Sequence, residues 1–167
     1  WKSYGLTEAQ VRAYFTSPAL LPWHRMANID GMLGPLPMSY IDGQMKLQKQ
    51  ILARSRALGM KPILGAFAGH VPKALVTVKP GIKTTAIGWA WQDAKESTAF
   101  LDPSDPLFTD IQKRYLKAQT EMYGTDHLYA ADPFNEMKAP SYEPDYLAGV
   151  ARTIYGGMTA VDPEAVW

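Results

Sequence analysis

The residues best suited to chemistry are a glutamate and the residues just before it, which follow a short aromatic segment. The stretch Ala131–Met137 reads Ala-Asp-Pro-Phe-Asn-Glu-Met and comes directly after a candidate strand at 127–131. A carboxyl group there, preceded by an amide that can hydrogen-bond a sugar substituent, is what a general acid for glycoside cleavage requires. The Asn-Glu pair is common by itself, so a solvated loop glutamate is the alternative interpretation of Glu136.

Elements that alternate along the chain must position this segment. Candidate strands lie at 60–67 and 127–131, and a third begins at Val166, with helices predicted at 106–123 and 144–161 between them. This alternation favours parallel βα units, for which a (β/α)8 barrel is the commonest fold. A full barrel needs about 250 residues, so the 167 residues hold roughly the first-half to middle βα units. We therefore expect 1–167 to be one partial (β/α)8 catalytic domain, truncated at both ends.

Local signals predict the bounds and the buried faces of the helices. Thr7 and Gln10 have the pattern of a capping box before a helix at 8–15. Ser39 is a candidate N-cap for a helix at 40–58. That helix places its apolar residues on about half of its circumference, namely Ile41, Met45, Leu47, Ile51, Leu52 and Leu58.

The later helices are predicted in the same way. Asp105 as N-cap, Pro106 at the first helical position and Gly124 at the end define the helix at 106–123. We expect one side of it to be apolar, with Leu107, Ile111, Tyr115 and Met122. The helix at 144–161 is expected to bury Leu147, Val150, Ile154 and Met158. Tyr129 is predicted to be a core residue of its strand.

Composition excludes several classes of function. The net charge is +1, and Lys and Arg are spread along the chain, so no nucleic-acid-binding or polybasic membrane-binding surface is indicated. Three His and no Cys are too few for a structural zinc site, and we predict neither a metal nor a cofactor. No apolar run approaches the roughly 18 residues of a membrane-spanning helix.

Several segments resemble, in order and at similar spacings, the glycoside hydrolases of family 89, which are α-N-acetylglucosaminidases. The segments that carry this resemblance are Pro18–Asn28, Gly34–Pro37, Gly59–Pro72, Tyr123–Tyr129, Asp132–Met137 and Met158–Trp167. No single one of these motifs would identify the family. Their combination is specific and covers nearly the whole chain.

The resemblance implies a retaining mechanism that uses two carboxylates. Glu136 matches the family's general acid/base, and Asn135 would hydrogen-bond the sugar near its 2-acetamido group. Two carboxyl groups in such enzymes lie roughly 5–5.5 Å apart. The family's nucleophile is a glutamate on a later barrel strand, and it is expected beyond Trp167.

The resemblance also points to residues that bind the sugar. Trp23 matches a position in the family's sugar-binding pocket, where an indole can cover the apolar face of a pyranose; a buried core tryptophan is the alternative. His70 follows the strand at 60–67 and could line the same site, although a lone histidine is more often structural. Trp89 and Trp91 follow a weaker candidate strand and could wall the pocket.

The implied substrate is a glycan, of glycosaminoglycan or mucin type, that ends in α-linked N-acetylglucosamine. The implied partner is the remainder of the barrel in the parent enzyme, and relatives make an extracytoplasmic location the expectation. Two alternatives stay open. One is a barrel glycosidase of another specificity, and the other is a non-catalytic sugar-binding or structural fragment.

Overall fold

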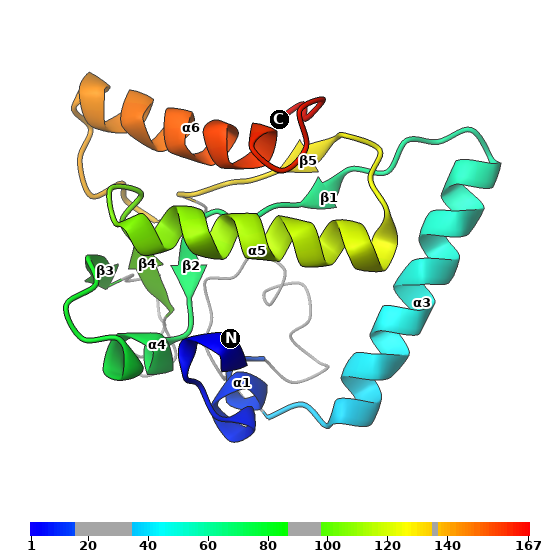
Figure 1. Cartoon of the computed structure of the whole chain (residues 1–167), viewed down its shortest axis with the longest axis horizontal. Coiled ribbons are helices and arrows are strands. Elements are labelled where there is room, and N and C mark those ends of the chain that lie inside the picture. The colour runs from blue at the N-terminus through cyan, green and yellow to red at the C-terminus, as the bar shows by residue number, and fades with distance from the viewer. Residues whose placement is uncertain (16–34, 87–97, 135–136) are drawn as a thin grey trace. The chain divides into compact units, whose positions relative to one another are not determined.

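The computed structural model describes residues 1–15, 35–86, 98–134 and 137–167 (Figure 1). The described residues form two compact units, each assembled from three stretches of the chain. The first unit comprises residues 1–41, 69–102 and 133–140, and the second comprises residues 42–68, 103–132 and 141–167.

The second unit contains short parallel strands. Strand β1 (Leu64–Gly65) pairs with β5 (Tyr129–Ala130), with Leu64 opposite Tyr129. On the other side, Leu128 forms a parallel bridge with Val166. Two of the predicted strands are therefore present, and the third is represented by the bridge at Val166; all three segments pair in chain order and in the same direction. β1 is shorter than the predicted strand at 60–67, because ladder pairing includes only its last part.

Two helices join these strands, as a series of βα units requires. Helix α5 (Pro106–Tyr123) lies between β1 and β5 in the chain, and α6 (Pro144–Thr159) lies between β5 and Val166. The predicted N-cap of α5 is confirmed, because the Asp105 carboxylate accepts a hydrogen bond from the Leu107 amide at 2.9 Å. α5 and α6 pack against each other and supply most of this unit's buried side chains.

The buried face of α5 differs in part from the predicted one. Tyr115 and Met122 were expected in the core, but they are 43% and 42% exposed. Ile111 is buried as predicted, and the other core side chains of α5 are Phe108, Gln112 and Leu116, which lie at helical spacing from it. On α6 the prediction holds for Val150, Ile154 and Met158, whereas Leu147 is only partly buried.

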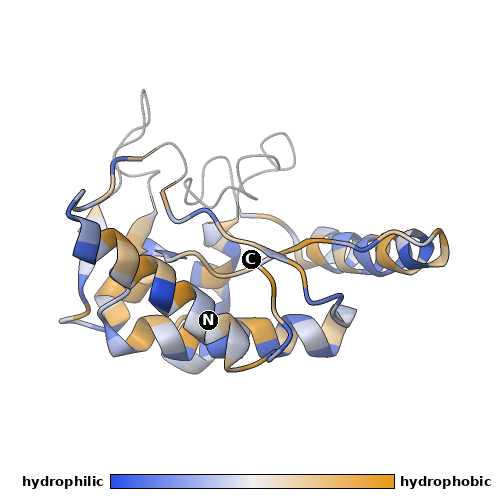
Figure 2. Cartoon of the chain, turned by 90° about the horizontal axis from the view of Figure 1, so that it is seen from above, coloured by the Kyte–Doolittle hydropathy of each residue, from blue (hydrophilic) through white to orange (hydrophobic). Residues whose placement is uncertain are grey.

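Helix α3 (Met38–Ala57) begins one residue before its predicted cap, so Ser39 lies inside the helix. Of its predicted apolar face, only Leu52 is buried. Leu47 and Ile51 are each 47% exposed. Hydrophilic and hydrophobic residues alternate along this helix (Figure 2), as they do in an amphipathic helix whose apolar side has little cover.

The first unit contains an antiparallel sheet that was not predicted. Its strands are β2 (His70–Val71), β3 (Thr84–Ala86) and β4 (Ala99–Leu101), with β4 in the middle. The short helix α4 (Lys73–Val78) lies between β2 and β3 in the chain. Strands of two or three residues are too short to show a period of two, so no alternating pattern could predict them.

The start of the chain also belongs to this unit. A 3-10 helix, η1 (Lys2–Tyr4), precedes α1 (Glu8–Tyr14). The predicted capping box is confirmed in both directions: the Gln10 amide donates to the Thr7 hydroxyl at 3.2 Å, and the Thr7 amide donates to the Gln10 side chain at 2.8 Å.

Candidate active site

The carboxyl ends of the parallel strands lead directly into the first unit. After β1 ends at Gly65, the chain continues into residues 69–102 of the first unit. After β5 ends at Ala130, it continues into residues 133–140 of the same unit. In (β/α)8 enzymes, the loops that follow the strands at this edge carry the catalytic groups. Both of these loops contribute to one compact unit. Because the antiparallel sheet lies between β1 and α5 in the chain, it is itself part of a strand-to-helix loop.

The loop after β5 is held on both sides of the predicted acid. The amide of Met137 donates a hydrogen bond to the carbonyl oxygen of Phe134 at 3.1 Å. The two residues between them in the sequence are Asn135 and Glu136, which lie outside the described residues. The ring of Phe134 packs against that of Phe100, with centroids 5.6 Å apart.

His70 is buried in the antiparallel sheet. It is 4% exposed and lies opposite Phe100 in the register of β2 and β4, with the two rings edge to face at 5.8 Å. Its Nδ1 lies 3.4 Å from the hydroxyl of Thr98. His70 thus lies on the loop after β1, as predicted. Its burial and its contact with Phe100 are typical of a residue that supports a site.

The predicted binding tryptophans Trp23, Trp89 and Trp91 lie outside the described residues. Within the described ranges, no group of three His, Asp or Glu side chains could hold a metal ion. In the same ranges, no helix has the length and apolar character needed to cross a membrane.

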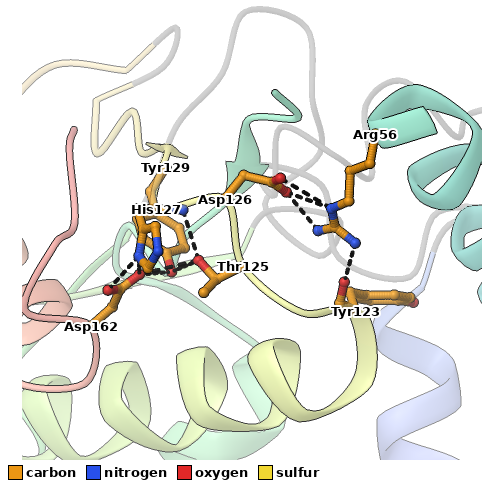
Figure 3. A network of polar contacts seen from close by, with 7 residues as sticks. All are labelled: Arg56, Tyr123, Thr125, Asp126, His127, Tyr129 and Asp162. Atoms are coloured by element: carbon orange, nitrogen blue, oxygen red, sulfur yellow. Dashed lines mark hydrogen bonds and ion pairs between the residues drawn. The ribbon is translucent and has the colours of Figure 1, made fainter. Parts of the chain in front are cut away.

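A polar network that the sequence did not predict lies at the opposite, amino end of β5 (Figure 3). Asp162, which is 6% exposed, accepts hydrogen bonds from the Tyr129 hydroxyl at 2.6 Å and the Thr125 hydroxyl at 3.1 Å. His127 Nδ1 lies 2.8 Å from Oδ1 of the same carboxylate. Tyr129 is buried as predicted, at 4% exposure.

The network shifts the pKa values of its members. Hydrogen bonding to Asp162 raises the pKa of His127, and this effect outweighs the partial loss of solvent. Burial alone would raise the pKa of Asp162, but the hydrogen bonds from Tyr129, His127 and Thr125 outweigh it and leave that pKa lowered. The sequence signal for this network was the presence of polar residues just before two parallel segments, Thr125 and His127 before β5 and Asp162 before Val166. Such residues meet at one edge of the sheet. In barrels that edge serves stability rather than catalysis.

A second polar contact joins α3 to the segment after α5. The guanidinium of Arg56 donates to Asp126 through Nε, at 2.9 Å to Oδ2, and through Nη2, at 2.6 Å to the same oxygen. Its Nη1 donates to the carbonyl oxygen of Tyr123 at 2.9 Å. Hydrogen bonding to Arg56 lowers the pKa of Asp126. This fork fixes the turn that leads into His127 and β5 (Figure 3).

Comparison with known proteins gives a consistent result. The family model described as alpha-N-acetylglucosaminidase (NAGLU) tim-barrel domain matches residues 1–167. Alpha-N-acetylglucosaminidase from Homo sapiens is 47% identical over 165 residues, which make up 98% of this chain and 22% of the human protein. The chain therefore spans less than a quarter of that relative's length.

Solved structures of a family 89 glycoside hydrolase from Clostridium perfringens have a similar fold. The complexes with 2-acetamido-1,2-dideoxynojirmycin and with PUGNAc each match with a TM-score of 0.87, at 22% and 23% identity. Each match covers 99% of this chain and 19% of the bacterial one. Together with the family model, this similarity confirms the predicted fold class, part of a (β/α)8 barrel.

Proposed function

We propose, because this chain belongs to the alpha-N-acetylglucosaminidase TIM-barrel family, that it is the acid/base-bearing segment of a retaining exo-glycosidase. The enzyme would remove terminal α-linked N-acetylglucosamine from glycans. The observation that carries this proposal is the match of the family model to all 167 residues. Because the chain spans 22% of the human relative, the rest of the active site would come from the parent protein.

Glu136 is the proposed general acid/base. In the first step its carboxylic acid gives a proton to the glycosidic oxygen while a second carboxylate attacks the anomeric carbon, so that the aglycone leaves as an alcohol. In the second step the Glu136 carboxylate takes a proton from water, which displaces the enzyme carboxylate and releases the sugar with its original configuration. The attacking carboxylate is expected beyond Trp167.

The supporting roles follow the same proposal. Asn135 would hydrogen-bond the sugar near its 2-acetamido group, and the indole of Trp23 would cover its apolar face. His70 would line the same site. Its 4% exposure and its packing on Phe100 favour a supporting role over direct contact with the sugar. No metal or cofactor is required by this mechanism.

The proposed substrate class agrees with the bacterial neighbours. One Clostridium perfringens structure holds its substrate GlcNAc-α-1,4-galactose, in a variant with two Glu-to-Gln substitutions. At 22% identity this match shows the fold alone, so the α-linked N-acetylglucosamine specificity rests on the family. An extracytoplasmic location is part of the proposal by the same resemblance.

The decisive experiment uses the full-length parent enzyme with Glu136→Gln. We expect kcat/KM for GlcNAc-α-1,4-galactose to fall by about 100- to 10,000-fold, because the sugar alcohol leaves poorly without a proton. A nitrophenyl α-glycoside should lose much less in kcat/KM, because its leaving group needs little protonation. Glu143→Gln, at an exposed position whose side chain does not cap α6, is the matched control and should behave as wild type.

Glu136→Ala with added azide distinguishes the acid/base from the nucleophile. If Glu136 is the acid/base, azide enters the vacated space, attacks the glycosyl-enzyme and yields the α-glycosyl azide, with the configuration retained. If Glu136 were the nucleophile, azide would attack the substrate directly and yield the β-azide. Wild-type turnover of the disaccharide by Glu136→Gln would refute any role of Glu136 in acid catalysis.

A further inference from the structure

Three aromatic rings from two separate loops form one stack in the first unit. Phe100, on β4, is fully buried at 0% exposure and occupies the middle position. Its ring lies 5.8 Å from that of His70, at 71° between planes, and 5.6 Å from that of Phe134, at 44°. Tilted and edge-to-face arrangements at these separations are the favourable ones for aromatic pairs.

The sheet holds the middle ring in place. Phe100 pairs with His70 on one side and with Thr85 on the other, in antiparallel register. The amide of Leu101 donates to the carbonyl oxygen of Gly69 at 2.8 Å, and the amide of Asp102 donates to that of Lys83 at 2.9 Å. A ring on a central strand, with no exposed surface, cannot shift without disturbing close packing on every side.

The outer ring belongs to the residue directly before the proposed catalytic pair. Phe134 adjoins Asn135 in the sequence, and its carbonyl oxygen accepts the hydrogen bond from Met137, which directly follows Glu136. The residues on both sides of the pair are therefore tied to one another. The ring of Phe134 also packs against Phe100 in the sheet.

We propose that Phe100 is a positioning residue for Glu136, acting through the ring of Phe134 from the antiparallel sheet of the preceding strand-to-helix loop. The inference rests on the proposed function of Glu136. Acid catalysis needs the carboxyl group within hydrogen-bond reach of the glycosidic oxygen, and a misplacement of 1 Å can cost about 100-fold in rate. The loop after β1 would thus align the acid carried by the loop after β5.

The test uses Phe100→Leu in the full-length parent enzyme, with Phe108→Leu as the matched control. Phe108 is also 0% exposed and packs on an aromatic ring, that of Phe67 at 5.0 Å, but it lies on α5 and not in the stack. Both variants should lower the melting temperature. Only Phe100→Leu should lower kcat/KM for GlcNAc-α-1,4-galactose, by about 10-fold or more, while that for a nitrophenyl glycoside stays within about twofold.

Phe134→Leu approaches the same contact from the other side and guards against poor folding of Phe100→Leu. It should reproduce the selective loss on the disaccharide, and Phe100→Leu placed in the Glu136→Gln background should cause no further loss. The proposal is overturned if both substrates lose equally, or if the two substitutions multiply in the double variant. A Glu136→Gln enzyme without leaving-group dependence would instead overturn the proposed function, so the two failures are distinguishable.

Discussion

His127 and Asp162, 35 residues apart in the sequence, face each other with Nδ1 at 2.8 Å from one carboxylate oxygen and 2.9 Å from the other. His127 holds a backbone φ of 63°, and its carbonyl oxygen accepts the amide of Val166 at 2.7 Å. The amide of Glu164 in turn donates to Asp162 at 3.2 Å. The pair therefore ties the turn after α6 to the start of β5.

This geometry predicts that the pair stabilises the protein most at mildly acidic pH. The pKa of His127 is raised above its ordinary 6.5, so its contribution is complete below about that pH and is lost as pH rises through the raised pKa. His127→Asn, which tolerates the left-handed backbone, should lower the melting temperature of the parent protein more at pH 5 than at pH 8. Equal losses at both pH values would show that the imidazolium does not contribute. The nearby acids Asp126 and Glu164 act in the same direction.

Tyr129→Phe should give a loss that does not vary between pH 5 and pH 8. The Tyr129 hydroxyl donates to Asp162 at 2.6 Å, and removal of this donor from a buried carboxylate should cost about 1–3 kcal/mol of unfolding free energy. The lowered pKa of Asp162 means that its contribution is lost only as pH falls through that pKa, below the ordinary 3.8. Urea unfolding measures the difference. A loss that disappears at pH 8 would assign the effect to His127 instead.

Two neighbouring glycines of α6 should respond in opposite ways to alanine. A Cβ at Gly157 would collide with the buried Gln112 side chain, whose Nε2 donates to the Ile154 carbonyl oxygen at 2.6 Å. A Cβ at Gly156 would meet nothing within 4 Å. We expect Gly157→Ala to destabilise by about 1–3 kcal/mol and Gly156→Ala to be neutral or to stabilise by up to about 1 kcal/mol. Equal effects on urea unfolding would contradict the packing of α5 on α6.

Arg56→Lys should destabilise the protein although the charge is kept. Lysine cannot reproduce the planar fork that reaches both Asp126 and the carbonyl oxygen of Tyr123. Because Arg56 is one-third exposed, the expected loss is about 1 kcal/mol, measured as a shift of the urea midpoint. Arg152→Lys, at an exposed position of α6, is the control and should change stability by less than about 0.5 kcal/mol.

Trp23→Ala tests the sugar-stacking prediction. In the parent enzyme it should raise the inhibition constant of an N-acetylglucosamine-like inhibitor by an amount that corresponds to about 1–3 kcal/mol, as lost aromatic stacking does elsewhere. The melting temperature should change much less. A large drop in melting temperature with unchanged affinity in the folded fraction would identify a core tryptophan instead.

Much of the framework follows from local signals in the sequence. Asp105, Pro106 and Gly124 determine the bounds of α5, because capping and backbone preferences act within a few residues. The capping box of α1 follows in the same way, whereas the parallel direction of the strands follows from the alternation of strands and helices along the chain. The motif at Asp132–Met137 is also local, and together with the other segments it points to the family.

The tertiary structure alone decided which distant side chains meet. The contact of His127 with Asp162, and the stack of Phe100 on Phe134, join residues more than thirty positions apart. The face of α5 that is buried depended on α6 rather than on the apolar residues of α5 by themselves. Burial is a property of the neighbours that a fold supplies. A sequence specifies each side chain and its local backbone, but packing selects the contacts that hold a catalytic group in place.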